Sequence, residues 1–526
     1  MDTKTDRIVI VGGGSAGWMT AATIIRAYPD KNVTLLESPT ISTIGIGESS
    51  LPEMNYWVDF LGIDWDELFV EAEATWKISG KFVDFIELNH EFYVTTAYLN
   101  HDDYFDKHSE LGVEEWWYKK QLFPNTPDSD FYEYHFPQYH MIKNNAFTRD
   151  ENPNLYPFKP NHHGAIQLNA IKFAEYLKNK YAKPRGVKHI LGTVKEVVPR
   201  EDGAVKHLIL SDGSILEGDL FVDCTGFKSL LLGEFLKVPF KSTLDILPHN
   251  RAFFAPVEYT DKNIEMDSMA TATGLGNGWA WNTPVWSRLG TGYTWSDEFI
   301  DEEGALQEFK NHLDSKNMAV FDPNRSKKTE IKSVNVKNGY YEKSFVKNVV
   351  AIGLSSGFMD PLEASGLFFI MSSALALTTV LNRSLVSDLD RAIYNEELAD
   401  ITEMYLQFIP MHFQFTRRDD TPYWKKWRER PTNNIVVRSI AKTTVNRAWH
   451  EFSSTRLAIL HGANYPVVKP STGYFPYRQN IPNYDNLTKA VLSSIKKREE
   501  LINMWKHEIS TLPSQYEYLK KKLYDR

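Results

Sequence analysis

Three glycines near the N-terminus have the spacing of a phosphate-binding loop. Gly12, Gly14 and Gly17 follow the pattern G-x-G-x-x-G, in which glycines allow a tight turn, close approach of the backbone to a pyrophosphate and close packing of the next helix. Glu37 lies 20 positions after Gly17, where an acidic side chain would accept hydrogen bonds from a ribose hydroxyl. The spacing therefore predicts a dinucleotide-binding site. The alternative is an ordinary glycine turn that binds no ligand.

The segments around these glycines decide between the two interpretations. An apolar run at residues 8–11 precedes the loop, residues 21–27 continue as a helix, and residues 33–36 form a second strand-like run that ends at Glu37. In this order of strand, loop and helix, the helix N-terminus faces the phosphates with its unbonded N–H groups and positive dipole end. The context favours dinucleotide binding.

Later segments of the chain are expected to extend the same sheet. Strand-like runs at residues 187–198, 207–210 and 220–223 are separated by turn-forming Asp and Gly residues. Such strands would complete a sheet that carries the adenosine half of FAD. Residues 348–353 form another buried strand that runs into Gly353, where the flavin half would lie.

These elements predict an α/β fold with a glutathione-reductase-type FAD-binding core and an interleaved, mostly helical substrate lobe. Helices are expected over residues 55–74 and 167–181, and over most of the chain from residue 367 onward. The expected division is residues 1–99 for the first part of the core, 100–161 for an irregular insertion covering the substrate site, 162–380 for the second part of the core with a substrate-facing sheet, and 381–526 for a helical C-terminal lobe.

The composition narrows the class of protein. The net charge is -9, so no overall positive field favours nucleic acid. The single cysteine, Cys224, excludes an internal disulfide, fits a reducing compartment and is expected to be a buried, inert thiol. The N-terminus does not resemble a signal peptide, and the longest apolar segment, residues 367–381, is too short to span a bilayer. We therefore expect a cytoplasmic protein without a membrane or metal site, and homo-oligomerisation is left open.

Several motifs in a fixed order carry a resemblance to a known family. They are GGGSAGW at 12–18, GIGESSLP at 45–52, TWKISGKF at 75–82, LFVDCTGF at 220–227, GWAWNTP at 278–284, IGLSSGFMDPLEASG at 352–366 and HFQFTRRDDTPYW at 412–424. With these motifs the sequence resembles the flavin-dependent tryptophan halogenases over nearly its whole length. The resemblance implies FAD, used as FADH2 from a separate flavin reductase, a halide (chloride, bromide or iodide), O2 and a small, electron-rich aromatic substrate.

The resemblance implies catalytic roles for Lys77 and Glu363. In this family the reduced flavin, O2 and halide give hypohalous acid, which Lys77 would hydrogen-bond or capture before presenting the halogen to the ring. Glu363 would stabilise the cationic ring intermediate or polarise the halogenating species, and would take the ring proton. Without the resemblance, Lys77 is an ordinary solvated lysine with Lys81 as its competitor on the same helical face, and Glu363 is a helix-start glutamate.

The resemblance also implies a barrier, a halide site and a set of cofactor contacts. Trp279 and Trp281 match the family's W-x-W-x-I-P pattern, in which two bulky indoles keep the substrate away from the flavin; otherwise they are two tryptophans of a core strand. The backbone N–H groups of Ser365 and Gly366 would bind the halide. The implied cofactor contacts are Gly12, Gly14, Ser15, Ala16, Gly17, Glu37, Glu48, Val194, Gly353 and Leu354.

The chain departs from the family's motifs beside the catalytic residues and, separately, in the expected substrate pocket. Thr283 replaces the isoleucine of the tryptophan motif, and Ala364 replaces a serine beside the catalytic glutamate. Residues 92–96 read FYVTT where tryptophan-specific members carry a His and a Phe that sandwich the indole, and the aromatic segment near residues 446–454 is shortened. We therefore expect an indole or a phenol, rather than free tryptophan, as the substrate.

Two other functions are compatible with the sequence. An FAD-dependent aromatic hydroxylase would need its substrate beside the flavin and a nicotinamide-driven reduction. A flavin-binding protein without catalysis would be unaffected by the loss of Lys77. Retention of the tryptophan pair, the lysine and the glutamate favours the halogenase.

Overall fold

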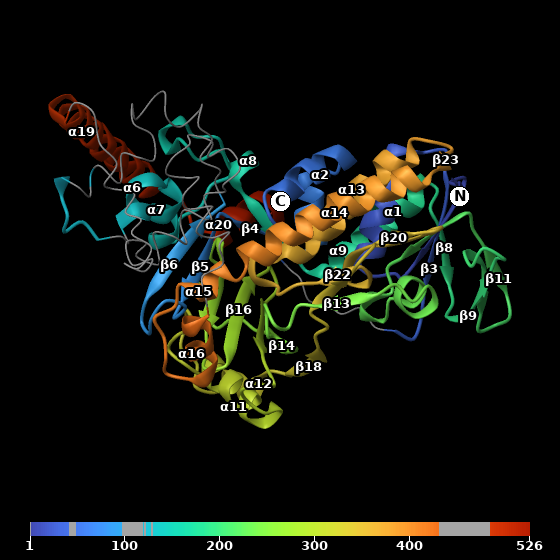
Figure 1. Ribbon diagram of the computed structural model, residues 1–526. Helices are drawn as coiled ribbons and strands as arrows, with labels where there is room; N and C mark the ends of the chain where they lie inside the picture. The colour runs from blue at the N-terminus through green and yellow to red at the C-terminus, as the bar shows by residue number, and fades with distance from the viewer. Residues whose placement is uncertain are drawn as a thin grey trace.

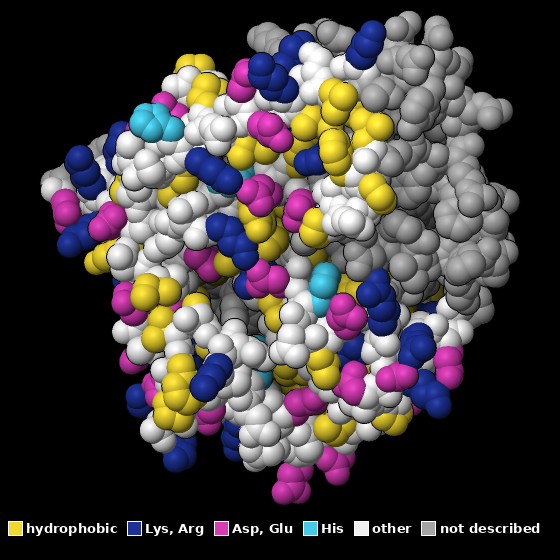
Figure 2. Space-filling model, turned by 90° about the vertical axis from the view of Figure 1, so that its left-hand side faces the viewer, with side chains coloured by type: hydrophobic (Ala, Val, Ile, Leu, Met, Phe, Trp, Pro, Cys, Tyr) yellow, Lys and Arg dark blue, Asp and Glu magenta, His cyan; other side chains and the backbone are white. Residues whose placement is uncertain are grey.

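The computed structural model describes residues 2–41, 49–96, 119, 122–127, 130–430 and 484–525. Two large β-sheets lie toward opposite ends of a pair of long helices, α13 (Ser365–Leu381) and α14 (Asp388–Phe408), which run side by side (Figure 1). The charged side chains on the face shown in Figure 2 are interspersed in sign, with basic and acidic groups alternating over short distances. That pattern fits the net charge of -9 and gives this face no extended basic field.

The first sheet has six strands and holds the glycine loop. In spatial order its strands are β20 (Phe345–Val346), β21 (Val349–Ala351), β12 (Leu220–Asp223), β2 (Arg7–Val11), β3 (Asn32–Glu37) and β8 (Lys188–Leu191). All neighbouring pairs are parallel except β20 with β21. Helix α1 (Ser15–Ala27) follows β2 and packs against α13. This order confirms the predicted strand, loop and helix, and places the loop at the carboxyl end of a central strand, where α/β sheets bind ligands.

The prediction that residues 187–210 complete this sheet is only partly right. Strand β8 joins it, but β9 (Val194–Pro199) and β10 (Val205–Leu210) form a separate three-stranded antiparallel sheet with β11 (Ile215–Glu217). Hydropathy cannot distinguish the two outcomes, because both sheets bury one face of their strands in the same apolar cluster.

The second sheet has seven strands and draws on two distant parts of the chain. In spatial order its strands are β18 (Lys332–Asn335), β14 (Arg251–Val257), β17 (Leu289–Trp295), β16 (Gly278–Pro284), β15 (Met269–Gly274), β5 (Ser79–Val83) and β6 (Glu91–Thr95). Pairing of β5 with β15 interleaves the early and middle segments of the chain. The four-part division of the chain stays a prediction.

Helix α13 is apolar enough to raise the question of a membrane. The expectation that this apolar segment is too short to span a bilayer is wrong: the stretch Leu362–Leu381 is long and apolar enough by length and composition, and half of its most apolar window is buried inside the protein. It packs against α1 and α14, as the core helix of a globular protein does. Its neighbours therefore account for its hydropathy.

Two predicted helices are interrupted, and the reasons are local. The predicted helix over residues 55–74 is split into α2 (Glu53–Leu61) and α3 (Trp65–Glu71), because Gly62 ends α2 in a left-handed conformation and Asp64 caps α3. The predicted helix over residues 167–181 is α9 (Ala170–Tyr176), which continues as a π-helical turn over Leu177–Ala182.

The segment predicted as an irregular insertion, residues 100–161, lies partly outside the described residues. Its described part is more regular than expected, since it contains α6 (Asp130–His135), α7 (Pro137–Lys143) and the start of α8 (Pro160–His163). Toward the C-terminus, α15 (Met411–Gln414), α16 (Pro422–Glu429), α19 (Tyr484–Ile509) and α20 (Gln515–Leu519) agree with the predicted helical character.

Candidate active site

A cavity of about 840 Å³ runs between the two sheets along α13 and contains nearly all of the predicted site residues. Those that line it are Gly12, Gly14, Ser15, Ala16, Glu37, Lys77, Val194, Trp279, Trp281, Gly353, Leu354, Glu363, Ser365 and Gly366. Gly17 does not line the cavity, and Glu48 lies outside the described residues. One end of the cavity is the glycine loop, and the other contains the lysine and the glutamate. Its size is within the usual range for ligand sites.

The glycine loop is shaped as a pyrophosphate cradle. Gly12 has a φ of +122°, and a Cβ placed there would lie 2.2 Å from the carbonyl oxygen of Cys224, so only glycine fits. Helix α1 begins at Ser15, and its N-cap residue, Gly14, offers no side chain to the first turn. The N–H groups of that turn therefore face the cavity without a capping side chain, as a bound phosphate requires. These residues fit FAD.

Gly17 contributes to the cradle through packing rather than contact. A Cβ at this position would lie 1.9 Å from the backbone oxygen of Gly12. We expect Gly17→Ala to displace the loop, lower the free energy of unfolding by about 1–3 kcal/mol and weaken FAD binding. Thermal unfolding and titration of flavin fluorescence measure the two effects. Ser15→Ala, on the same helix, adds no bulk and should leave the melting temperature nearly unchanged; equal behaviour of the two variants would contradict the prediction.

Glu37 is the last residue of β3, beside the glycine loop, and its carboxylate forms hydrogen bonds with two neighbouring side chains. Its Oε2 accepts hydrogen bonds from Lys178 Nζ at 3.0 Å and from His189 Nε2 at 2.8 Å. Burial, together with the nearby charge of Lys178, lowers the pKa of His189, so the imidazole is neutral at pH 7 and donates through Nε2. Because both contacts fall on Oε2, Oε1 can accept a hydrogen bond from a ribose hydroxyl.

Lys77 lies at the other end of the cavity, and its side chain is buried, which is unusual for a lysine. It ends β4 (Thr75–Lys77), is only 6% exposed, and donates a hydrogen bond from Nζ to Ser49 Oγ at 2.9 Å. Burial lowers its pKa to about 8, while the carboxyl groups of Glu363 and Glu53 act in the opposite direction. The ordinary alternative, a solvated surface lysine, is therefore wrong.

The expectation that Lys81 shares a helical face with Lys77 is also wrong, because the two residues lie on strands β4 and β5. Lys81 does not line the cavity, and its Nζ forms an ion pair with Glu91 Oε2 at 2.6 Å. The two lysines are four residues apart, but a short break separates β4 from β5. The side chain of Lys77 therefore lines the cavity, whereas that of Lys81 contacts Glu91 outside it.

Glu363 is held in a strained turn before α13. Glu363 and the next residue, Ala364, have φ values of 69° and 54°, a left-handed conformation that costs a non-glycine residue of order 1–3 kcal/mol and concentrates at functional sites. Glu363 Oε1 lies 2.8 Å from His412 Nε2, and His412 Nδ1 lies 3.1 Å from the carbonyl oxygen of Ile409. Since a carbonyl only accepts, Nδ1 carries a proton, and the contact with Glu363 requires one more proton shared between imidazole and carboxyl.

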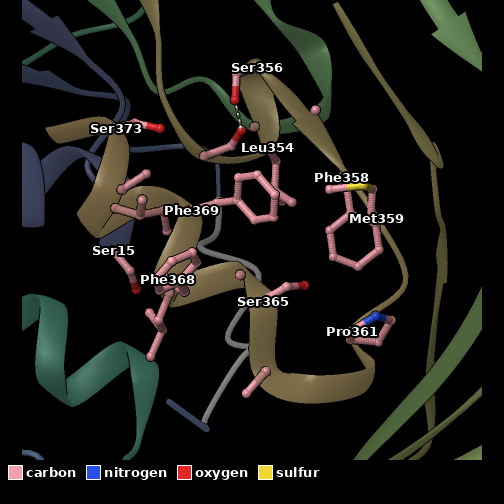
Figure 3. Close-up of a pocket in the computed structure, with 18 of the residues that line it drawn as sticks. Ser15, Leu354, Ser356, Phe358, Met359, Pro361, Ser365, Phe368, Phe369 and Ser373 are labelled. Carbon is pink, nitrogen blue, oxygen red and sulfur yellow. Dashed lines mark hydrogen bonds between the residues drawn. The ribbon is translucent and has the colours of Figure 1, made fainter. Parts of the chain in front are cut away.

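The start of α13 presents backbone N–H groups to the cavity. Ser365 is buried and Gly366 follows it; a Cβ at Gly366 would meet no atom within 4 Å, so the backbone there is open to a small ion. Figure 3 shows Ser365 at the end of the turn that begins at Pro361, with Phe358 and Met359 on the approaching strand. The N-terminus of a 17-residue helix favours an anion by its unbonded N–H groups and its dipole.

Trp279 and Trp281 lie two residues apart on β16, so both indoles point to the same face of the sheet. Their ring centroids are 5.9 Å apart, and both rings line the cavity. Trp279 is almost completely buried, and Trp281 is half-buried. Thr283, the departure from the family motif, lies on the same face and also lines the cavity.

Sequence reasoning missed several groups that contact these residues. Ser49 and Glu53 face Lys77, and His412 contacts Glu363. His412 stands within a motif that was used only to support the family resemblance, so its type could have suggested a role. Ser49 also stands within such a motif, GIGESSLP at 45–52, whereas Glu53 gave no such signal; only the fold brings both of them to the lysine. Cys224 is a buried thiol whose pKa is raised by burial, as expected of an inert cysteine.

Comparison with known proteins agrees with this geometry. A sequence model described as tryptophan halogenase matches residues 7–483. The tryptophan 6-halogenase SttH of Streptomyces toxytricini is 30% identical over 98% of each chain, and the tryptophan 7-halogenase RebH of Lentzea aerocolonigenes is 26% identical over 99% of each. The crystal structure of SttH has a TM-score of 0.82 to this chain, with 29% identity over 98% of this chain and 99% of that one. BrvH, a flavin-dependent halogenase from Brevundimonas sp. BAL3, has a TM-score of 0.80 with 26% identity over 98% and 99% of the two chains.

Proposed function

Because this chain belongs to the tryptophan halogenase family, we propose that it is an FADH2-dependent enzyme that transfers electrophilic halogen through Lys77 to an electron-rich aromatic ring. The observation that supports this most directly is that one and the same cavity contains a phosphate cradle, a buried lysine and a strained glutamate. A buried ammonium beside carboxylates is costly to maintain and concentrates at functional sites. A protein that only bound flavin would have no need of it.

The proposed roles follow from the surroundings of each residue. Bound FADH2, supplied by a separate reductase, would provide hypohalous acid from O2 and halide. The N–H groups of Ser365 and Gly366 hold the halide, and the ammonium of Lys77 donates a hydrogen bond to the oxygen of hypohalous acid, which makes the halogen more electrophilic. Glu363 stabilises the positive charge on the ring and accepts its proton. Hypohalous acid and an aromatic C–H thus become an aromatic carbon–halogen bond and water.

The pKa of Lys77 predicts the pH dependence of the transfer step. With a pKa of about 8, roughly nine-tenths of the side chain is ammonium at pH 7 and roughly one-tenth at pH 9. Since the ammonium is the proposed donor, transfer should fall about tenfold per pH unit above 8. The ratio of halogenated product to hypohalous acid captured by a small-molecule trap isolates this step from flavin chemistry. A ratio that rises through pH 8 would instead assign transfer to the neutral amine.

The proposed substrate is an indole or a phenol rather than free tryptophan. The described walls of the cavity include Phe82, Val94 and Phe408, which suit a flat, apolar ring. The shortened segment expected near residues 446–454 lies outside the described residues. The named relatives SttH and RebH are tryptophan halogenases, so the departure at residues 92–96 is the support for a different substrate here.

Mass spectrometry of the products tests the proposed function. Purified protein is incubated with FAD, a flavin reductase, NADH, O2 and bromide or chloride over a panel of indoles, phenols and tryptophan. We expect the isotope pattern of a halogen in the product, with indoles or phenols favoured over tryptophan. A product that gains one oxygen would indicate a hydroxylase, and preference for tryptophan would overturn the substrate proposal. The proposal also includes a cytoplasmic location, no nucleic-acid or membrane partner, and the reductase as a partner only through diffusing FADH2.

A further inference from the structure

Three completely buried polar side chains lie behind Trp279 and the turn that carries Glu363. They are Asp360, His249 and Tyr423, and each has 0% of its surface exposed. None of the three lines the cavity. They come from distant segments: His249 precedes β14, Asp360 begins the turn before α13, and Tyr423 lies in α16.

Asp360 contacts both parts of the site that must be held relative to one another. Its Oδ2 accepts a hydrogen bond from Trp279 Nε1 at 3.4 Å, and its Oδ1 accepts one from the backbone N–H of Leu362 at 3.1 Å. Its carbonyl oxygen accepts a hydrogen bond from Ser365 Oγ at 3.4 Å. One residue therefore links the tryptophan barrier, the strained turn and the first residue of α13.

His249 and Tyr423 complete a row of contacting buried polar groups that ends at this carboxylate. His249 Nδ1 is in ion-pair contact with Asp360 Oδ2, and His249 Nε2 lies 2.7 Å from the hydroxyl of Tyr423. The three side chains therefore contact one another in the order Tyr423, His249 and Asp360, and the imidazole lies between the hydroxyl and the carboxylate.

The free-energy cost of burying these three polar side chains indicates that they have a function. A buried carboxylate is tolerated only when it is well hydrogen-bonded, and such networks specify one arrangement of their surroundings. The turn it supports contains two consecutive residues in the left-handed conformation, Glu363 and Ala364, which persist only where neighbouring structure holds them. The network ties that turn to β16, which carries the tryptophan pair.

We propose that Asp360, His249 and Tyr423 form a positioning unit that fixes Trp279 and the Glu363 turn relative to one another, and so sets the share of hypohalous acid that reaches the substrate rather than escaping. This inference rests on the proposed halogenase function. A displacement of about 1 Å at a reacting group can cost on the order of a hundredfold in rate. None of the three residues lines the cavity, so we expect them to act through the positions of the residues that do.

The test compares Asp360→Asn and Tyr423→Phe with a matched control. The control, Tyr293→Phe, also removes one buried tyrosine hydroxyl, which donates a hydrogen bond to Glu308 Oε2 at 2.6 Å. Tyr293 lies on β17, which pairs with the strand that carries the two tryptophans, and it does not line the cavity. Each protein is assayed with its proposed cofactors for product formed and for hypohalous acid captured by a small-molecule trap. Hydrogen exchange of the amides of residues 360–366 is measured in parallel and needs no activity.

We expect the ratio of product to trapped acid to fall about tenfold or more in the two variants, with faster exchange over residues 360–366 and FAD affinity within about twofold. Because Tyr423→Phe keeps the aromatic ring and its packing, this variant still tests the proposal if the Asp360→Asn protein does not fold. A ratio or an exchange rate equal to that of the Tyr293→Phe control would overturn the proposal. Absence of both product and trapped acid in the unmodified protein would instead overturn the halogenase function, while the exchange measurement would still decide on positioning.

Discussion

Lys77→Ala should abolish halogenation, with product formation reduced by about three orders of magnitude or more. The variant removes the buried ammonium that donates to hypohalous acid, and no other described lysine lining the cavity lies near Glu363: Lys228 belongs to the turn after β12. FAD binding should be retained, because the glycine loop and Glu37 lie at the other end of the cavity. Product is measured by mass spectrometry, and hypohalous acid by its capture in a small-molecule trap, which should continue.

Lys81→Ala is the matched control for this prediction. It removes a lysine four positions away, on the next strand, whose charge is neutralised by Glu91 outside the cavity. Loss of that partly exposed ion pair should change stability by no more than about 1 kcal/mol and leave halogenation within a few-fold. Equal activity of Lys77→Ala and the unmodified protein would contradict the role assigned to Lys77, whereas a loss in both variants would point to a structural effect on these strands.

The nucleotide end of the cavity was predictable from sequence because its chemistry is local. The turn, the helix start and the acidic end of the next strand lie within residues 8–37, and each needs particular residue types: glycine at Gly12 for φ, glycine at Gly17 for packing, and a carboxylate at Glu37. Short-range spacing is enough to specify such a unit.

The reaction end depended on the family resemblance, because it is assembled from segments far apart in the chain. Nothing in the residues around Lys77 indicates that the side chain is buried, or that Ser49 and two carboxyl groups surround it. Lys77 and Lys81 were expected to share a helical face, but the segment forms strands, since β4 pairs with β7 (Ala165–Gln167) and β5 pairs with β6 and β15. Tertiary pairing decides the structure of such short segments.

The positions of single charged groups were beyond sequence reasoning for the same reason. Glu37 was expected to bind ribose, and the structure adds that Lys178 and His189 hold one of its oxygens. For Glu363 the sequence indicated a catalytic role but no hydrogen-bond partner, and the structure adds His412, which is 49 positions away. A hydrogen bond of this kind depends on angles that only the packed fold sets.

Glu363→Gln should lower kcat by about 10²- to 10³-fold with little change in KM. The amide has nearly the same shape and can still contact His412, so the substrate binds as before. It cannot carry the negative charge that stabilises the cationic ring, and it is a poor acceptor for the ring proton. Steady-state kinetics on the preferred aromatic substrate measure both constants, with the hypohalous acid trap as a check that the earlier steps continue.

Glu363→Asp separates the charge from its position. It keeps the carboxylate but withdraws it by one methylene from the ring and from His412, so its kcat should lie between those of the Gln variant and the unmodified protein. Removal of the ring proton should also become slower in the Gln variant, and a substrate deuterated at the reacting carbon should then react more slowly than the ordinary substrate. If Gln and Asp lower kcat equally and the deuterated substrate reacts at the ordinary rate, Glu363 acts by shape alone and neither stabilises the cation nor accepts the proton.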